Sequence, residues 1–312
     1  MDRATRQFAD APGTRHATPL LFAVYGPSGS GKTFSSLRLA TGIQRVSGGE
    51  IFGIDTESNR MLQYAETFKF RHVPFGQPFS PLDYLDAIEY CVSKGAKTII
   101  IDSMSHEHEG PGGVLEEHDH EVERIMGAWK CTEEKANIPA WGKPKRKRQT
   151  LINRILQINC NFIFCFRAKD KVKIGGGKVT QLGFMPIAGE DFIYEMSATA
   201  LLLPGARGTP TWNSNEVGEK LMIKLPDQFE DLFREVRQLD EDAGMKMAQW
   251  AAGTKPVTAQ EVDSLIASYP AAPDKASFDK LETIRNGMWR QISTEQKAAL
   301  KSASDTAKAR VS

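Results

Sequence analysis

Residues 26–33 read GPSGSGKT, and this stretch decides the fold. It fits the pattern G-x-x-x-x-G-K-[ST] and lies between a short apolar run, Leu20–Tyr25, and a segment with helical apolar spacing from Lys32 to about Val46. Glycines allow backbone N–H groups to face phosphate oxygens, and the positive end of the following helix faces the same point. The sequence therefore predicts a phosphate-binding loop made of Gly26, Pro27, Ser28, Gly29, Ser30, Gly31, Lys32 and Thr33.

Further side chains complete the predicted nucleotide site. Lys32 can reach the β and γ phosphates of ATP, and the Thr33 hydroxyl can ligate Mg²⁺. Asp102 ends the apolar run TIIID, where its carboxylate would hold Mg²⁺ or its water; the alternative is a helix N-cap. Glu57 follows another apolar run in GIDTES and could polarise a water that attacks the γ phosphate, although a surface turn explains its position equally well.

Short apolar runs alternate with helical patterns along the chain. After Leu20–Tyr25, the candidate strands are Ile51–Ile54, Thr98–Ile101, Asn161–Phe166, Ala198–Leu203 and Leu221–Leu225. The candidate helices are Pro81–Lys94, Gly113–Glu134 and Lys145–Ile158, and a hairpin is expected over Lys171–Gln181. This alternation predicts an α/β fold with a mostly parallel sheet.

Composition divides the chain into four parts. Residues 1–18 are polar and are expected to form a flexible arm, and residues 19–240 are expected to form the α/β core. Beyond a linker at about 241–253, residues 254–312 are rich in alanine and predict a small region of three short helices. Thr258 with Glu261, and Ser293 with Gln296, fit the capping-box pattern that marks helix starts.

The overall composition is that of an ordinary globular protein. The 312 residues include 40 basic and 39 acidic side chains and four cysteines without a CxxC pair, which indicates a reducing compartment. We find no apolar stretch of bilayer length and no apolar core of a secretory signal near the N-terminus. We therefore expect a cytoplasmic protein with no membrane partner.

A net charge near zero conceals two charged blocks. Residues 106–134 hold nine acidic side chains against Arg124 and Lys130, and residues 143–181 hold eleven basic ones against Asp170. The basic block could bind nucleic acid, and the acidic block could meet the basic block of a neighbouring subunit. The alternative is two solvated faces without a partner.

These motifs carry a resemblance to a known family. GPSGSGKT, GIDTES at 53–58 and TIIIDSMS at 98–105, at these separations, resemble the ATPase core of the RecA recombinases. The continuation LINRILQINCNFIFCFRAKDK at 151–171 and FMPIAGEDFIYEM at 184–196 is similar to phage-encoded core-only RecA-like proteins, the single-strand annealing ATPases often described as AAA-family proteins. The resemblance covers roughly residues 19–235 and implies a RecA-like P-loop NTPase core.

The resemblance assigns roles to two further positions. It implies that Glu57 is the catalytic glutamate and that Arg167, at the end of the fourth core strand, senses the γ phosphate and couples it to DNA-binding loops. The recombinase has glutamine at this second position, so an arginine here could stabilise transition-state charge directly.

The same resemblance implies two loops along a DNA path, at His106 to about His120 and at Ala168 to about Met185. The second loop flanks a triple glycine with lysines, and the nearby stretch KPKRKR extends the basic set. The expected DNA-binding residues are Lys145, Arg146, Lys147, Arg148, Lys169, Lys171, Lys173 and Lys178. Aromatic residues are sparse there, with Trp141 and Phe184 the best candidates for base stacking, so contacts to the phosphate backbone should dominate.

Two features of this sequence differ from the recombinase family: the short segment before the first strand and the composition of the first expected loop. Fewer than 20 residues precede the first strand, although Phe8–Ala11 resembles a recombinase polymerisation motif; a homo-oligomer, as filament or ring, is expected. The first loop is acidic and holds four of the six histidines, and we interpret it as a mobile polar loop rather than a metal site. A single-strand-binding protein could contact the C-terminal helices.

Together these features predict an ATPase that binds single-stranded DNA, couples Mg²⁺–ATP hydrolysis to DNA affinity, and promotes annealing or strand exchange. Two alternatives stay open. One is a P-loop kinase acting on a small molecule, which would transfer phosphate to an acceptor other than water. The other is a non-catalytic adaptor that uses ATP as a switch to load partners onto DNA.

Overall fold

A computed structural model of the chain describes residue 10 and residues 18–175, 178–213, 224–233, 237–253, 257–289 and 292–311, without the side chains of residues 171–182, 294 and 311. The expected arm at 1–18, with its Phe8–Ala11 motif, lies outside these residues except for Asp10 and Thr18. The same holds for Gly176 and Gly177 of the triple glycine and for residues 221–223 of the last expected strand.

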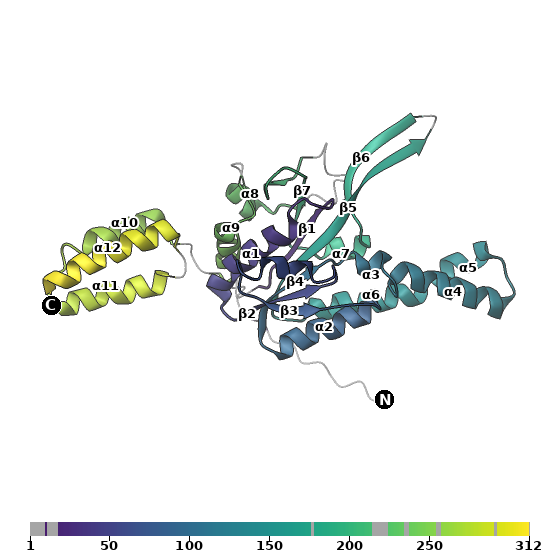
Figure 1. Cartoon of the computed structure of the whole chain (residues 1–312), viewed down its shortest axis with the longest axis horizontal. Coiled ribbons are helices and arrows are strands. Elements are labelled where there is room, and N and C mark those ends of the chain that lie inside the picture. The colour runs from purple at the N-terminus through teal and green to yellow at the C-terminus, as the bar shows by residue number, and fades with distance from the viewer. Residues whose placement is uncertain are drawn as a thin grey trace.

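The described strands form one mixed sheet (Figure 1). They are β1 (Leu21–Gly26), β2 (Glu50–Asp55), β3 (Arg71–Pro74), β4 (Ala96–Asp102), β5 (Asn161–Gly175), β6 (Lys178–Pro186), β7 (Ala198–Leu202) and β8 (Pro210–Thr211). Their order is β3-β2-β4-β5-β1-β7-β8, and β6 pairs with β5. The pairs from β3 through to β7 are parallel, whereas β8 and β6 are antiparallel to their neighbours. The predicted α/β fold with a mostly parallel sheet is confirmed.

Helices cover both faces of this sheet because successive strand residues point to opposite sides. The helices of the core are α1 (Lys32–Ser47), η1 (Arg60–Tyr64), α2 (Pro81–Ser93), α3 (His106–Glu109), α4 (Val114–Trp129), α5 (Glu133–Ala140), α6 (Gly142–Ile155), α7 (Glu190–Tyr194), α8 (Asp227–Phe233) and α9 (Glu241–Ala251). In β1, Ala23 and Tyr25 pack with α2 and α6, whereas Phe22 and Val24 pack with α1 and α9. All four side chains are buried, so β1 lies between two apolar layers.

Helix α9 corrects the linker expected at about 241–253. It packs closely on α1: a Cβ added to Gly42 would lie 1.9 Å from the Glu241 carbonyl oxygen, and one added to Gly244 would lie 2.2 Å from the Leu39 carbonyl oxygen. Arg38 also donates to the Glu241 carboxylate from Nε at 3.0 Å and from Nη2 at 2.8 Å. The core therefore extends through Ala251, because glycine on each helix lets the two backbones approach.

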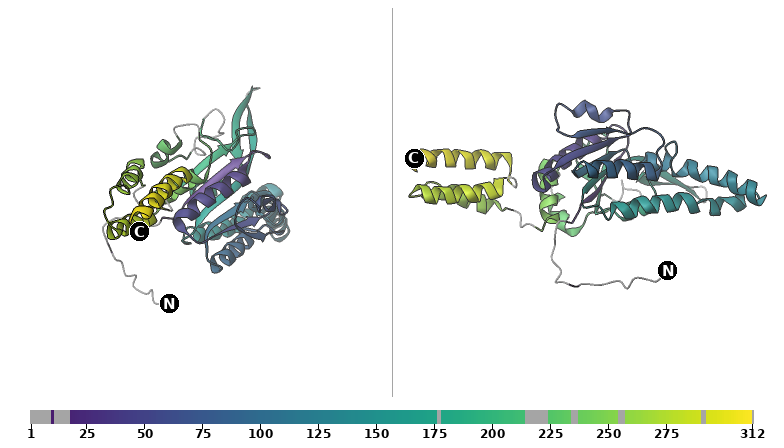
Figure 2. Two further views of the ribbon diagram at one scale, coloured as in Figure 1. Left: turned by 60° about the vertical axis from the view of Figure 1, so that its left-hand side comes forward. Right: turned by 90° about the horizontal axis from the view of Figure 1, so that it is seen from below.

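Two projections leave the core at the same end (Figures 1 and 2). Helices α4, α5 and α6 form a helical arm, and the long strands β5 and β6 form a hairpin that runs beyond the sheet. The hairpin pairing extends from Ala168 opposite Pro186 to Gly175 opposite Lys178, in agreement with the hairpin expected over Lys171–Gln181.

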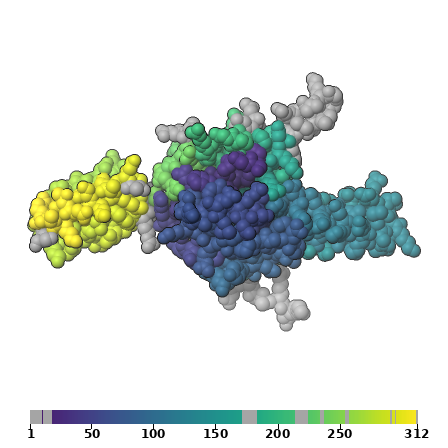
Figure 3. All heavy atoms as spheres, viewed as in Figure 1, coloured from purple at the N-terminus to yellow at the C-terminus, as the bar shows by residue number. Residues whose placement is uncertain are grey.

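The C-terminal region forms a small helical bundle, as predicted. Its helices are α10 (Ala259–Ser268), α11 (Lys275–Met288) and α12 (Thr294–Val311), with an apolar centre that includes Val262, Tyr269 and Leu300. The bundle lies on the side of the core opposite the helical arm (Figure 3). Thr258 and Glu261 form the predicted capping box at the start of α10. Among the described residues, we find no helix with the length and apolarity needed to traverse a bilayer.

Candidate active site

The carboxyl ends of the central strands bring the predicted site residues to one edge of the sheet. Strand register places Asp55 of β2 opposite Asp102 of β4, and Arg167 of β5 opposite Gly26 of β1. Parallel strands end at the same edge, so residues separated by up to 141 positions in the chain meet there. This edge also holds the start of α1, whose positive dipole end is a suitable anion site.

The phosphate-binding loop connects β1 to α1 in the expected strand–loop–helix context. Gly29 and Gly31 have φ values of 76° and 86°, in the left-handed region that side-chain-bearing residues rarely adopt. A Cβ added to Gly26 would lie 2.1 Å from the carbonyl oxygen of Leu202, on the neighbouring strand. The glycines of the motif are therefore required both by the turn and by close packing.

Lys32 points into this loop. Its Nζ donates hydrogen bonds to the carbonyl oxygens of Gly26 and Pro27, at 2.9 Å each. Burial lowers the pKa of its ammonium group, and the negative charges of Asp102 and Glu57 act in the opposite direction. A cation held inside a loop of this kind is placed to bind phosphate oxygens.

Thr33 and Asp102, the two residues expected to hold Mg²⁺, lie against each other. The Thr33 hydroxyl donates to Asp102 Oδ2 at 2.5 Å, and Asp102 is only 6 % exposed. Burial raises the pKa of the Asp102 carboxyl to about 6, partly offset by the Thr33 hydrogen bond and the charge of Lys32. Hydroxyl and carboxylate oxygens are the hard donors that Mg²⁺ prefers, and this ion normally keeps several waters and phosphate oxygens as further ligands. The pair therefore fits Mg²⁺ bound together with a nucleotide.

Glu57 and Arg167 lie against each other at the edge of the site. Arg167 donates from Nε to Glu57 Oε1 and from Nη2 to Glu57 Oε2, both at 2.9 Å. The Glu57 side chain is 15 % exposed and that of Arg167 is 42 % exposed. Glu57 and Arg167 thus form one bidentate ion pair, which holds the carboxylate of Glu57 in a fixed orientation.

The comparison with family models agrees with this geometry. A family model described as an AAA domain matches residues 18–196, more than half of the chain. The chain belongs to the AAA domain family. A search among curated proteins gives no match for it. The AAA domain here is thus a P-loop module of an ATPase family that generally binds ATP with Mg²⁺, and its matched residues include the loop, Asp102, Glu57 and Arg167.

The segment expected as the first mobile loop is ordered in the AAA domain. It contains α3 and the first half of α4, with buried residues such as Glu107 and His118. The His106 ring stacks on Phe79 with centroids 4.9 Å apart, and its Nδ1 lies 2.7 Å from Thr56 Oγ1. Burial and the charge of Arg167 lower the pKa of His106. The interpretation of residues 106–120 as a mobile loop is therefore wrong, because their apolar and paired side chains pack on the core.

Arg148 does not belong to an exposed basic surface. It is 5 % exposed and donates to the Glu107 carboxylate from Nε at 3.0 Å and from Nη2 at 2.8 Å. Glu107 is itself 3 % exposed, and burial raises the pKa of its carboxyl. Arg148 shares the inner face of α6 with Leu151, Ile152 and Ile155, so the prediction that it binds DNA is corrected: it forms a buried ion pair at the base of the arm.

The other basic residues that were expected to bind DNA differ in their exposure and in whether they form ion pairs. Lys145 and Arg146 are exposed on α6, with Lys145 Nζ 5.8 Å from the Trp141 ring centroid. Lys147 pairs with Glu117 at 2.5 Å, and Lys169 pairs with Glu109 at 3.1 Å while its side chain stays 67 % exposed. The side chains of Lys171, Lys173 and Lys178 lie outside the described residues, although their backbones belong to β5 and β6.

The two aromatic residues expected to stack on bases are engaged within the protein. Trp141 stacks on His118, with ring centroids 4.0 Å apart, and Phe184 is partly buried against the core. This leaves the exposed cations as the groups of this surface that can meet a polyanion.

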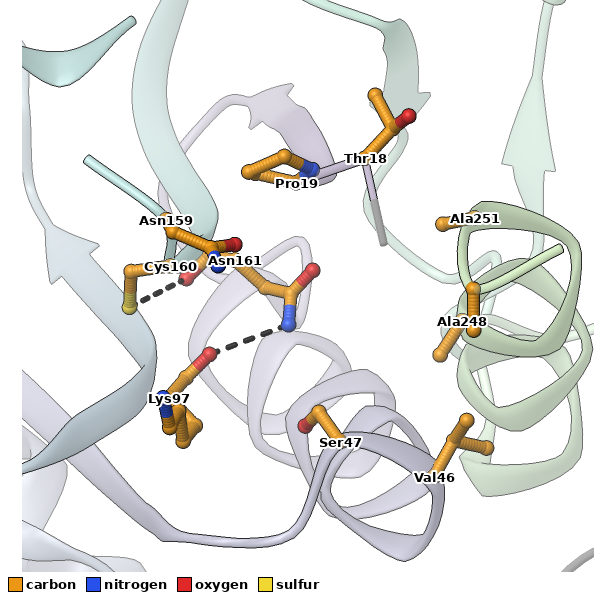
Figure 4. Close-up of a pocket in the computed structure, with 11 residues that line it drawn as sticks. Thr18, Pro19, Val46, Ser47, Lys97, Asn159, Cys160, Asn161, Ala248 and Ala251 are labelled. Atoms are coloured by element: carbon orange, nitrogen blue, oxygen red, sulfur yellow. Dashed lines mark hydrogen bonds between the residues drawn. The ribbon is translucent and has the colours of Figure 1, made fainter. Parts of the chain in front are cut away.

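A separate pocket lies at the opposite edge of the sheet (Figure 4). It has a volume of about 240 Å³ and is lined by the end of α1, the end of α9 and the starts of β1 and β5. Its polar groups are mostly paired: Asn161 Nδ2, for example, donates to the Lys97 carbonyl oxygen at 3.1 Å. Burial raises the pKa of the Cys160 thiol to about 12, so this thiol is protonated at neutral pH. We assign no chemistry to this pocket.

Asp55 is a site residue that sequence reasoning missed. It ends β2 two positions before Glu57 and is 2 % exposed, with its carboxylate directed at the turn that carries Glu57. A signal was present in GIDTES, where a carboxylate ends an apolar strand in the same way as Asp102 does in TIIID.

Proposed function

We propose that this AAA-domain protein is an Mg²⁺-dependent ATPase that binds single-stranded DNA and promotes annealing or strand exchange, with its DNA affinity set by the bound nucleotide. The observation that carries the proposal is the continuity of β5. This strand runs without interruption from Asn161 to Gly175, pairs with β1 beside the phosphate-binding loop, and continues into the hairpin with β6. Arg167 lies on it between the two parts.

The proposed hydrolysis uses the groups around the phosphate-binding loop. Lys32 binds the β and γ phosphates, and Thr33 and Asp102 would hold Mg²⁺, which neutralises phosphate charge when bound. Glu57 orients and deprotonates the attacking water, a role that contributes about 10²–10⁴-fold in rate for a positioned general base. This role requires a carboxylate that is free to accept a proton.

The Glu57–Arg167 ion pair supplies the proposed coupling. In this pair both oxygens of the Glu57 carboxylate accept hydrogen bonds from the Arg167 guanidinium, so they face Arg167 rather than a water molecule. The γ phosphate of ATP is an anion that competes with Glu57 for Arg167, so triphosphate binding would release Glu57 and move the Arg167 side chain. Because the backbone of Arg167 donates to Ser105 Oγ and accepts from the Ile187 N–H, a shift there reaches both α3 and the end of β6.

The proposed DNA surface combines the hairpin and the arm. Lys169, Lys171, Lys173 and Lys178 lie on β5 and β6, and exposed Lys145 and Arg146 lie on α6. Cations that neutralise phosphates supply most of the sequence-independent affinity for single strands. We propose that the protein acts as a homo-oligomer, in a filament or a ring, and that the bundle α10–α12 receives a single-strand-binding protein.

A second candidate is favoured by the same ion pair. If Glu57 stays bound to Arg167 with ATP present, the protein would act as an ATP-switched adaptor that loads partners onto DNA without appreciable turnover. Tight nucleotide binding with negligible hydrolysis, in the presence and absence of DNA, would identify this adaptor.

One ATPase assay tests the proposal, run without DNA, with single-stranded DNA and with duplex DNA. We expect turnover that single strands stimulate more than duplex does, that Lys32→Ala abolishes, and that Glu57→Gln slows by at least about 10²-fold while nucleotide binding is kept. Turnover that no DNA stimulates, together with phosphate transfer to a small molecule, would replace the proposal with a kinase.

A further inference from the structure

The carboxylate of Asp55 organises the turn that follows β2. Asp55 Oδ1 accepts a hydrogen bond from the Glu57 N–H at 2.8 Å, and Asp55 Oδ2 accepts one from the Met61 N–H at 2.9 Å. The ring Nε2 of His72, on β3, lies 3.1 Å from the same Oδ2. One side chain, 2 % exposed, therefore spans the turn from its first residues to the buried Met61.

This turn has an unfavourable backbone that needs such support. Ser58 and Asn59 have φ values of 58° and 64°, in the left-handed region that is costly for residues with a side chain. The Asp55 carboxylate compensates by accepting the two N–H groups that flank these residues along the chain. Without it, the Glu57 and Met61 N–H groups would lose their hydrogen-bond partner at a partly buried position.

Thr56, the residue between Asp55 and Glu57, is hydrogen-bonded instead to the end of β4, the strand that carries Asp102. The Thr56 N–H donates to the Asp102 carbonyl oxygen at 2.8 Å, and Thr56 Oγ1 accepts from the Ser103 N–H at 2.8 Å. The backbone before Glu57 is therefore held to β4 through Thr56, and the Glu57 N–H itself is held by Asp55. The remaining contacts of its carboxylate are with Arg167 and, at 3.9 Å, with Arg60.

We propose that Asp55 is a positioning residue for Glu57: its carboxylate fixes the Glu57 backbone so that the Glu57 side chain reaches both Arg167 and the attacking water. The inference rests on the proposed role of Glu57 as the general base. Asp55 touches neither the phosphate-binding loop nor the Thr33–Asp102 pair through any hydrogen bond found in the described part of the chain. Its loss should therefore affect turnover rather than nucleotide affinity.

The test compares Asp55→Asn with the wild type in steady-state ATP hydrolysis. Asparagine has nearly the shape of aspartate, but its amide offers one acceptor oxygen, so either Glu57 or Met61 loses its partner. A shift of about 1 Å at a catalytic group can reduce a rate about 10²-fold, and we expect kcat to fall about 10- to 100-fold. The KM for ATP and the Kd for a non-hydrolysable analogue should stay within about twofold, since Lys32, Thr33 and Asp102 keep their contacts.

A double-mutant cycle with Glu57→Gln separates positioning from a general structural role. If Asp55 acts through Glu57, Asp55→Asn should cause no further loss of turnover in the Glu57→Gln background. An equal loss in both backgrounds would overturn the inference. His72→Ala is the matched control, because it removes a contact of Asp55 Oδ2 that lies away from the turn, and it should leave kcat within about twofold.

The outcomes also separate this inference from the proposed function. Normal turnover in Glu57→Gln would refute the base and the positioning residue together. Slow turnover in Glu57→Gln with normal turnover in Asp55→Asn would refute Asp55 alone. If Asp55→Asn is unstable, Asp55→Ser serves as a second variant: its hydroxyl can still accept the Glu57 N–H, so a kcat within about tenfold of the wild type supports the inference and a larger fall contradicts it. Loss of analogue binding in both variants would overturn the proposal, because Asp55 would then support the whole site.

Discussion

Asp102 should make the protein less stable than it would be with a neutral side chain at this position. Burial raises the pKa of its carboxyl from 3.8 to about 6. Each pKa unit corresponds to about 1.4 kcal/mol, so the charged form costs about 3 kcal/mol of folding free energy at pH values above both pKa values. The change to test is Asp102→Asn, which keeps an oxygen that can accept the Thr33 hydroxyl.

The sign and pH window of this effect follow from the direction of the shift. Between about pH 4 and pH 6 the folded state binds more protons at Asp102 than the unfolded state, so this group adds stability as the pH falls through that range. Asp102→Asn should therefore raise the free energy of unfolding by about 3 kcal/mol at pH 7.5. The gain should shrink below pH 6 and vanish near pH 4, where aspartate is protonated in both states.

The assay is chemical unfolding followed by circular dichroism at pH 7.5, 5.5 and 4. Asp86→Asn on the exposed face of α2 is the matched control and should stay within about 0.5 kcal/mol of the wild type at each pH. Asp102→Asn should at the same time lose magnesium-dependent ATP turnover, because a carboxamide is a poorer Mg²⁺ ligand than a carboxylate. Equal or lower stability of Asp102→Asn at pH 7.5 would refute the reasoning.

Two further changes test the arm and the proposed DNA surface. Arg148→Met should destabilise the protein by about 3–5 kcal/mol in a denaturant titration, because it leaves the Glu107 carboxylate buried without a partner. Arg146→Met, on the exposed side of α6, is the control and should change stability by no more than about 0.5 kcal/mol. Equal effects of the two substitutions would contradict the buried pair. Lys145→Gln combined with Arg146→Gln should weaken single-strand binding and reduce the slope of log K against log salt by about 1.4, measured by fluorescence anisotropy, with Lys94→Gln as control. An unchanged slope would remove α6 from the DNA surface.

Much of the nucleotide site is predictable because its signals are local. The phosphate-binding loop, β1 and α1 are contiguous, and Asp102 is marked by the buried run that it ends. Because parallel strands end at the same edge of a sheet, the gathering of Asp102 and Arg167 near the phosphate-binding loop could be predicted in outline, whereas Asp55 was not identified.

Other features depend on contacts that the sequence does not display. The Glu57–Arg167 pair joins residues 110 positions apart, and nothing in either segment specifies that partner. The sequence predicts a linker at about 241–253, but these residues form helix α9, whose packing on α1 depends on the close backbone approach at Gly42 and Gly244. The basic run KPKRKR predicts that Arg148 is exposed with its neighbours, whereas its spacing from Leu151, Ile152 and Ile155 places it on the apolar face of α6.

The central claim is that nucleotide at the Glu57–Arg167 pair controls the affinity of the β5–β6 hairpin for single strands. Anisotropy of a labelled oligonucleotide, titrated with the protein alone, with ADP and with a non-hydrolysable ATP analogue, tests it most directly. We predict that the analogue tightens binding at least tenfold, about 1.4 kcal/mol, and that Arg167→Gln removes this gain while the analogue still binds. The same affinity in all three nucleotide states of the wild type would contradict the claim.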